Sequence, residues 1–352
     1  MKIDRVHFYT RDATNTKDWF VRNVGFKAID STNNIDRNSY TRAEVIVLNS
    51  VCLVLESPLG SNSPVARYLD SHPSGVADIV FQVEDVRGII NRAQYLGLEI
   101  LQDIKTVRSV KGEFRTAKIQ GWGDLQHTLI ENVTQRCDRS SDINPNFNSY
   151  ITDIDHVVLN VAAGKLNSAV KLYQDLFGFK IQQSFDIQTT TSGLYSQALI
   201  DDTGTVQFNI NEPTSNNSQI QEFIDRNNGS GIQHLALRSQ NLIADVERMQ
   251  RNKVGFLTIP KTYYSDRLNQ LTNLDAREWQ AIVKRQILVD SDSTNMRSLL
   301  MQIFTQPIFE QPTFFLEFIE RRQQAKGFGR GNFKALFEAV ETEQNQIKIK
   351  DK

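Results

Sequence analysis

The sequence has few cysteines, which stabilise small secreted proteins through disulfide bonds, and no long apolar run of the kind that spans a membrane. It has two cysteines in 352 residues, Cys52 and Cys137, and therefore neither a disulfide framework nor a CxxC motif for zinc. No apolar run approaches the roughly 18 residues needed to span a membrane. Charged Asp4 and Arg5 precede any apolar leader. We therefore expect a soluble protein of a reducing compartment, the cytoplasm, with no membrane partner.

An excess of charge of either sign is also missing. Lysine and arginine number 40 against 41 aspartates and glutamates, which gives a formal net charge of −1. Nucleic-acid binding depends on basic side chains that contact phosphates, so this balance argues against such a partner. Neither GxSxG nor GxxxxGK[ST] occurs, which disfavours acyl transfer and nucleotide hydrolysis.

What the sequence does contain is a duplicated pattern. The segment IDRV at residues 3–6 opens a strand-like run, a helical stretch and then Gly-Phe-Lys, and IDHV at residues 154–157 opens the same series. A second pair begins SGVADIVF and SGIQHLAL, and each continues as strand, helix and strand. A third, weaker pair is HTLIENV and TFFLEFIE. Each half therefore reads as a pair of βαβββ units, and the fold class is α+β.

The two halves define the domain organisation. At about 150 residues per domain, the length suggests two domains. The stretch TQRCDRSSDINPNFNSYIT is rich in Asp, Asn, Ser and Pro and has no periodicity, as expected for a linker. We place the N-terminal domain at residues 1–140, the linker at 141–150 and the C-terminal domain at 151–352.

The second half ends in an element that the first half lacks. Phe333, Leu336, Phe337 and Val340 follow helical spacing, and Asn332 is a candidate N-cap before them. The sequence predicts an amphipathic C-terminal helix with an aromatic face. From this pattern alone, the helix reads most simply as a cap on the core.

Comparison of the halves singles out three residues as candidate metal ligands. His156 and His234 fall where the first half has Arg5 and Asp78, and we match Glu317 to the glutamate of HTLIENV, Glu131. Two imidazoles and one carboxylate form the facial triad that suits non-haem Fe(II) and leaves about three coordination positions free. The three residues lie far apart in the chain, so they can converge only through the fold. The alternative interpretation is that these are ordinary core or surface residues of strands that bind no metal.

The remaining histidines carry weaker signals. His7 and His127 lie near Arg5 and Glu131, but a second, degenerate metal site there would need further ligands, and we do not predict one. His72, in the sequence SHPSG, is expected at a solvent-facing turn.

With these segments identified, the chain resembles the 4-hydroxyphenylpyruvate dioxygenase family of the vicinal-oxygen-chelate superfamily. The resemblance is carried by IDHVVLNV, by the run from FNINEP through SQIQEFI to GIQHLAL, and by PKTYY, LLMQIFTQP, PTFFLEFIERR and GFGRGNFKALFEAVETEQ. It implies two tandem glyoxalase-like domains, each an open barrel of paired βαβββ modules, with the metal histidines absent from the first. It also implies that His156, His234 and Glu317 hold Fe(II).

The resemblance extends to residues around a substrate. It implies catalytic roles for Gln233, Gln302 and Phe304. It implies substrate binding by Ser196, Asn211, Gln219, Phe315, Phe328, Asn332 and Phe333. In the family the C-terminal helix acts as a gate over the active site. Asn209 departs from the pattern, because the family has proline two residues before the asparagine of the NEP motif.

The implied activity is that of an Fe(II)-dependent dioxygenase that converts 4-hydroxyphenylpyruvate and O2 to homogentisate and CO2, in tyrosine catabolism or in quinone and tocopherol synthesis. The partners would be the small 2-oxo acid and O2. One alternative is hydroxymandelate synthase, which oxidises the benzylic carbon, although Phe304 and the amide side chains favour ring hydroxylation. The other is a metal-free small-molecule binding protein of the same fold. A homo-oligomer is compatible with the sequence, with the first half as the natural interface.

Overall fold

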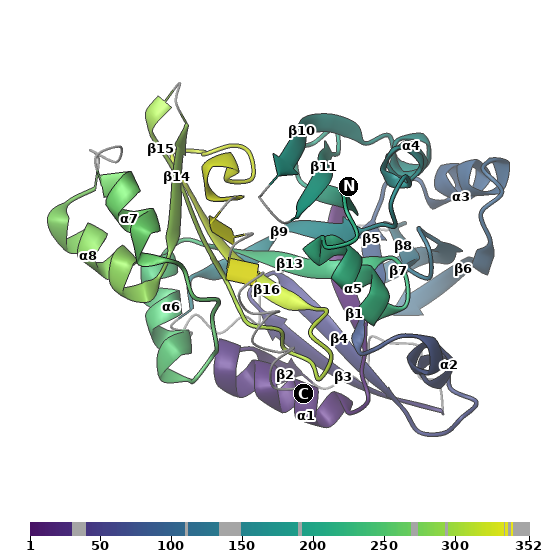
Figure 1. Ribbon diagram of the computed structural model, residues 1–352. Coiled ribbons are helices and arrows are strands. Elements are labelled where there is room, and N and C mark those ends of the chain that lie inside the picture. Colours follow the sequence, from purple (N-terminus) through teal and green to yellow (C-terminus); the bar gives the residue numbers. More distant parts are fainter. Residues whose placement is uncertain are drawn as a thin grey trace.

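The computed structural model describes residues 1–29, 40–109, 112–133, 149–188, 192–268, 274–292, 295–333, 335–336 and 339–340. These residues form two eight-stranded sheets with helices packed around them (Figure 1). The first sheet contains β1 (Lys2–Tyr9), β2 (Lys27–Ile29), β3 (Thr41–Leu48), β4 (Val51–Pro58), β5 (Gly75–Gln82), β6 (Ile100–Ser109), β7 (Gly112–Gln120) and β8 (Gln126–Asn132). The second contains β9 (Ile151–Asn160), β10 (Lys180–Gln188), β11 (Gly193–Ile200), β12 (Gln207–Pro213), β13 (Gly231–Ser239), β14 (Leu288–Asp292), β15 (Asn295–Phe304) and β16 (Phe315–Arg322).

The two sheets have the same topology. The strand orders are β2-β3-β4-β1-β5-β8-β7-β6 and β10-β11-β12-β9-β13-β16-β15-β14, which correspond position by position. Strand β1 is parallel to β4 and antiparallel to β5, and β9 has the same relations to β12 and β13. The duplication and the α+β class predicted from the sequence are confirmed.

Helices cover the sheets and connect their strands. They are α1 (Ala13–Trp19), its π-helical continuation η1 (Phe20–Val24), α2 (Pro64–Ser71), α3 (Val86–Tyr95), α4 (Leu166–Phe177), α5 (Gln219–Asn227), α6 (Leu242–Arg251), α7 (Lys261–Leu268), α8 (Ala276–Arg285) and the 3-10 turn η3 (Arg330–Asn332). Helices α3 and α6 occupy equivalent places, and each starts after a capping side chain, Asp85 or Asn241. In the described part of the chain, no helix is long and apolar enough to cross a membrane.

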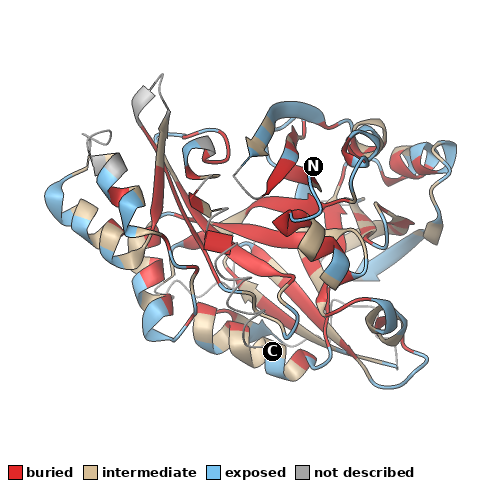
Figure 2. Ribbon diagram, in the orientation of Figure 1, coloured by how far each residue is buried: buried red, intermediate tan, exposed pale blue. Residues whose placement is uncertain are grey.

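The central strands are buried while the helices expose their outer faces to solvent (Figure 2). Strands β5 and β13 are buried along almost their whole length, which fits their apolar sequences GVADIVFQ and GIQHLALRS. The core is continuous between the halves: the fully buried rings of Phe8 and Phe314 meet edge to face, with centroids 5.1 Å apart. The first half therefore supports the second through apolar packing.

Two further histidines lie where the halves meet. His72 Nδ1 is 2.7 Å from the carbonyl oxygen of Asn227, and His127 Nε2 is 3.0 Å from the hydroxyl of Tyr173. His72 is only 6 % exposed, so its predicted place at a solvent-facing turn is wrong. The second half covers this turn, and the local sequence SHPSG carries no sign of that.

The register of the strands corrects one match between the halves. On β13, Ala236 lies two residues after His234 and pairs with Glu317. In the first sheet, Val80 lies two residues after Asp78 on β5, and the register places it level with Thr128 on β8. The counterpart of Glu317 is therefore Thr128, and the match to Glu131 is wrong.

Glu131 has a different counterpart, Glu320, and the two residues have the same structural role. A carboxylate oxygen of Glu131 accepts a hydrogen bond from Val86 N at 3.0 Å, and one of Glu320 accepts from Leu242 N at 2.7 Å. These amides open α3 and α6, where unpaired N–H groups favour a carboxylate. The first half thus retains none of the three candidate ligands at their positions.

Ion pairs fill the corresponding centre of the first sheet. Lys118 Nζ lies 2.9 Å from Asp78 Oδ2, and the Thr128 hydroxyl donates to the same carboxylate. His7 Nδ1 lies 2.8 Å from Glu56 Oε2. Within the described ranges, the residues that could jointly bind a metal are all in the second half.

Some sequence predictions concern residues outside those described. Residues 134–148, which include Cys137 and most of the predicted linker at 141–150, are among them, so the domain boundaries stay a prediction. Phe337 is another. The described residues near it, Phe333, Ala335, Leu336, Ala339 and Val340, are helical as predicted.

Candidate metal centre

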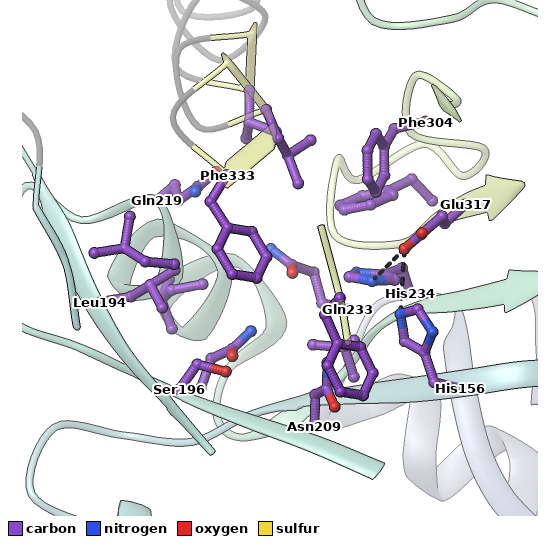
Figure 3. Close-up of a pocket in the computed structure, with 18 of the residues that line it drawn as sticks. His156, Leu194, Ser196, Asn209, Gln219, Gln233, His234, Phe304, Glu317 and Phe333 are labelled. Carbon is purple, nitrogen blue, oxygen red and sulfur yellow. Dashed lines mark ion pairs between the residues drawn. The ribbon is translucent and has the colours of Figure 1, made fainter. Parts of the chain in front are cut away.

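His156, His234 and Glu317 converge at the centre of the second sheet. Their candidate ligand atoms all lie within 4.8 Å of one another. Glu317 Oε2 is 3.2 Å from His156 Nε2 and 3.4 Å from His234 Nε2, as the dashed lines in Figure 3 show. All three residues are less than a tenth exposed. The structure thus brings together the three residues that the sequence predicted as ligands.

Strand order and register explain this convergence. The three residues come from β9, β13 and β16, which are adjacent strands. Ala236 pairs with His156 on one side and with Glu317 on the other. Because its side chain is small, the longer side chains on either strand can reach across it. His234, two residues earlier on the same strand, points to the same face.

Two of the three residues have partners that fix their orientation. His156 Nδ1 is 2.9 Å from Asp155 Oδ1, which leaves Nε2 facing Glu317. Gln302 Nε2 donates to Glu317 Oε1 at 2.9 Å, which leaves Oε2 facing the histidines. The ring of His234 stacks on Phe315, with centroids 4.8 Å apart, and its buried Nδ1 has no hydrogen-bond partner among the residues that the structure describes. Carboxylate or amide partners of this kind orient metal ligands in proteins.

The donor set fits a divalent cation. Glu317 is a buried carboxylate whose free oxygen faces two imidazoles, and the side chains that line the pocket around it include no lysine or arginine among the described residues. Burial of a negative charge is costly unless a cation compensates it. Two neutral imidazoles with one carboxylate suit first-row divalent metals and leave positions open on the pocket side.

The ionisation of the cluster reflects this shortage of positive charge. Burial alone would raise the pKa of Glu317, but the two histidines lower it to about 2. Burial alone would lower the pKa of His156, but the charge of Glu317 and the hydrogen bond with Asp155 raise it to about 9. Burial lowers the pKa of His234. Without a metal, the cluster therefore keeps one proton on His156 at neutral pH.

Metal affinity is accordingly expected to increase with pH. A ligating imidazole must be neutral, so binding below the His156 pKa of about 9 has to release one proton. The apparent Kd for Co(II) should fall about tenfold per pH unit between about pH 6 and about pH 8, and level off above about pH 9. Calorimetric titration in buffers of different ionisation enthalpy measures both Kd and the released proton. A Kd that does not change over this range would contradict the assignment.

A pocket opens from the cluster between the second sheet and the C-terminal helix. It encloses about 650 Å³ of empty space, part of it open to solvent. Its wall includes all but one of the residues predicted for the site: His156, His234, Glu317, Gln233, Gln302, Phe304, Ser196, Asn211, Gln219, Phe315, Phe328 and Phe333. Figure 3 shows Ser196, Gln219 and Phe333 on the side away from the cluster.

Asn332 is the exception. It is 2 % exposed and does not line the pocket. Its amide nitrogen donates to Gln302 Oε1 at 2.9 Å, and its oxygen accepts from the Tyr263 hydroxyl at 2.7 Å. The structure thus places Asn332 behind Gln302 and ties it to α7.

Other wall residues were not predicted for the site from the sequence. They are Val158, Ile187, Leu194, Asn209, Ile220, Leu336 and Val340. Strand alternation could have found two of them, because Val158 follows His156 by two residues and Leu194 precedes Ser196 by two. Leu336 and Val340 lie on the predicted apolar face of the C-terminal helix, so this face forms a wall of the pocket.

Two pocket amides have oxygens without a partner in the described part of the chain. Asn209 Oδ1 and Gln219 Oε1 are buried and accept no hydrogen bond from these residues. An unpaired buried acceptor costs about 1–3 kcal/mol, so a ligand that donates to either oxygen would recover this energy. The departure from proline at position 209 therefore adds a polar group to a pocket that also has four aromatic rings.

Comparison with known proteins places the chain in a family. Residues 153–275 match the Glyoxalase/Bleomycin resistance protein/Dioxygenase superfamily. The 4-hydroxyphenylpyruvate dioxygenase of Caenorhabditis elegans is 32% identical over 98% of this chain and 92% of its own. An uncharacterised protein of Synechocystis is 36% identical over 99% of this chain and 100% of its own. A solved structure of a 4-hydroxymandelate synthase variant from Streptomyces coelicolor has a TM-score of 0.85 and 27% identity, covering 97% of this chain and 98% of that one.

Fold and site together define a member of the glyoxalase and dioxygenase superfamily, with a cluster of two histidines and a glutamate that can bind a metal. Within that superfamily, the chain belongs to the 4-hydroxyphenylpyruvate dioxygenase family.

Proposed function

We propose that the protein is an Fe(II)-dependent dioxygenase that converts 4-hydroxyphenylpyruvate and O2 to homogentisate and CO2. The observation that carries this proposal is the convergence of His156, His234 and Glu317 from three adjacent strands at the end of a pocket with an aromatic wall. The family membership supports the same activity. The product would serve tyrosine catabolism or quinone and tocopherol synthesis.

The three residues would hold Fe(II) through two imidazole nitrogens and one carboxylate oxygen. When bound, Fe(II) in such a site supplies the activation of O2 and a place for the 2-oxo acid to chelate. The chain's own contribution is to hold the donors still. Asp155 keeps the proton of His156 on Nδ1, and Gln302 keeps one oxygen of Glu317 turned away from the site.

The pocket wall would position the substrate. Its aromatic side chains can enclose the phenol ring: Phe304, Phe315, Phe328 and Phe333. Its polar side chains can orient the hydroxyl and carboxylate groups: Ser196, Asn211, Gln219 and Gln233. The oxygen of Gln219, which has no partner among the described residues, gives a hydroxyl donor a defined partner. The C-terminal helix would exclude water from the reacting atoms once substrate is bound.

Hydroxymandelate synthase is the second candidate, because a variant of such an enzyme shares the fold of this chain over nearly its full length. Phe304 and the pocket amides, which match the ring-hydroxylating family, favour ring hydroxylation in our proposal. The two products contain the same atoms, and each reaction consumes one O2 and releases one CO2. Gas uptake therefore does not separate them, whereas chromatography does.

The test is an assay of the iron-loaded protein with 4-hydroxyphenylpyruvate. We expect one O2 consumed per substrate and homogentisate as the chromatographic product. Hydroxymandelate instead would select the second candidate. An absence of uptake with Fe(II) bound would contradict both and favour a binding protein.

A further inference from the structure

The buried carboxylate of Asp155 is shared between a candidate ligand and two arginines. Its Oδ1 lies 2.9 Å from His156 Nδ1 and accepts from Arg321 at 2.6 Å, while its Oδ2 accepts from Arg321 Nε at 2.8 Å and from Arg238 Nε at 2.9 Å. Asp155 is 1 % exposed. The pairing with Arg321 uses both carboxylate oxygens, which fixes the plane of the carboxylate and hence the direction of its bond to His156.

Arg321 also binds a backbone turn on its other side. Its remaining nitrogen donates to the carbonyl oxygens of Gly327 at 2.7 Å and Ala325 at 3.2 Å. Its guanidinium carbon lies 5.9 Å from the centre of the Phe328 ring. That ring packs edge to face on His156, with centroids 5.1 Å apart, and lines the pocket. One guanidinium thus connects the support of His156 to the turn at residues 325–329, which we call the Phe328 turn.

A second, independent contact joins the same turn to Glu317. Gln302 Nε2 donates to Glu317 Oε1 at 2.9 Å and to the carbonyl oxygen of Phe328 at 3.3 Å. The turn leads directly into the C-terminal helix, whose residues Phe333 and Leu336 line the pocket. Gln302 therefore links Glu317 directly to the Phe328 turn. Arg321 links His156 to the same turn through Asp155.

We propose that Arg321 is a positioning residue that couples metal binding at His156 to the ordered state of the Phe328 turn. The proposal rests on the metal site of the proposed function. Because coupling of two equilibria is reciprocal, bound metal should order the turn, and the ordered turn should strengthen metal binding. The turn that walls the pocket would then be more ordered with the metal bound than without it.

Arg238 provides a matched control. It lies on β13 and donates to the same oxygen of Asp155, and its other charged contact is Asp153 at 3.8 Å. Among the described residues it makes no hydrogen bond with the Phe328 turn. Loss of Arg238 weakens the support of Asp155 without touching the turn, whereas loss of Arg321 affects both.

The experiment compares Arg321→Lys and Arg238→Lys with the wild type, using Co(II) alone as the probe. Calorimetry gives the metal affinity, and amide hydrogen exchange follows residues 325–329 with and without Co(II). In the wild type, Co(II) should slow exchange in the turn. Arg321→Lys should bind Co(II) about tenfold more weakly and lose the metal-dependent slowing. Arg238→Lys should keep the slowing. Equal behaviour of the two variants would overturn the proposal.

A second experiment tests whether the ordered turn strengthens metal binding, by a substitution at Gly327. The φ of this residue, +82°, disfavours any side chain, and its carbonyl oxygen accepts a hydrogen bond from Arg321. Gly327→Ala should strain the turn and weaken Co(II) binding several-fold. Gly178→Ala, at a similar φ of +76° after α4, should leave the Kd unchanged. If Gly327→Ala binds Co(II) as tightly as the wild type, the coupling is contradicted, but the metal site and the proposed function are not. A wild type that does not bind Co(II) would instead contradict the metal site and the proposed function with it.

Discussion

His234→Ala is expected to give a folded protein that no longer retains a divalent metal. Mutation of a residue that hydrogen-bonds to a metal ligand typically lowers metal affinity or activity by about 10–100-fold. Loss of a ligand itself should therefore weaken metal binding by about a hundredfold or more. The fold should survive, because no described residue forms a hydrogen bond with His234 Nδ1 and because Glu317 keeps its bonds with Gln302 and His156. Metal content after dialysis and turnover of 4-hydroxyphenylpyruvate measure the effect.

His127→Ala is the matched control for this change. His127 is a fully buried histidine of the first sheet, where it contacts Tyr173, and it is not among the described residues that line the pocket or form the metal cluster. Its loss should lower stability yet leave the stoichiometry of bound metal unchanged. Full metal retention by His234→Ala would refute the ligand assignment, as would loss of metal from both variants to the same extent.

Phe8→Ala is expected to lower the free energy of unfolding by about 3–5 kcal/mol, which is typical for a large aromatic residue removed from a core. Phe8 is fully buried and lies on β1, where its ring meets Phe20, Phe309 and Phe314. The last of these precedes β16, the strand that carries Glu317. The cavity would therefore open between the supporting half and the half that has the metal site. Urea unfolding measures the change.

Tyr95→Ala serves as the control for that loss of an aromatic ring, because Tyr95 is 91% exposed. Its removal should change stability by no more than about 0.5 kcal/mol. A loss below about 1 kcal/mol in Phe8→Ala would mean that the halves do not depend on this contact. We also expect Phe8→Ala to bind Co(II) more weakly than Tyr95→Ala does, since β16 loses its support.

Much of the fold followed from the sequence because duplication is visible as repeated segments. IDRV and IDHV located β1 and β9, although β9 begins earlier, at Ile151, and SGVADIVF and SGIQHLAL located β5 and β13. The candidate ligands could be found because histidine is rare in the chain and because two histidines lay in these repeated strands. The aromatic and amide wall residues came from the family resemblance.

The features that could not be predicted from the sequence depend on the register of strand pairing and on contacts between segments far apart in the chain. Glu317 and Glu320 lie three residues apart in TFFLEFIE, and only strand pairing shows which of them matches Glu131. His72 is buried by a helix from the other half. The network of Asp155 and Arg321 was also missed, because charged residues in a strand ordinarily face solvent.

The ion pairs at the centre of the first sheet show how this architecture can change its chemistry. Arg5, Asp78 and Thr128 stand at the positions of the three candidate ligands, and Lys118 stands where the second sheet has Phe304. Both sets of side chains fit the same strand order and pairing. A duplicated copy could therefore lose or regain a metal site through substitutions at about four positions, without any rearrangement of the backbone. In this fold, the chemistry at the centre of the sheet can therefore change while the strand order and pairing are kept.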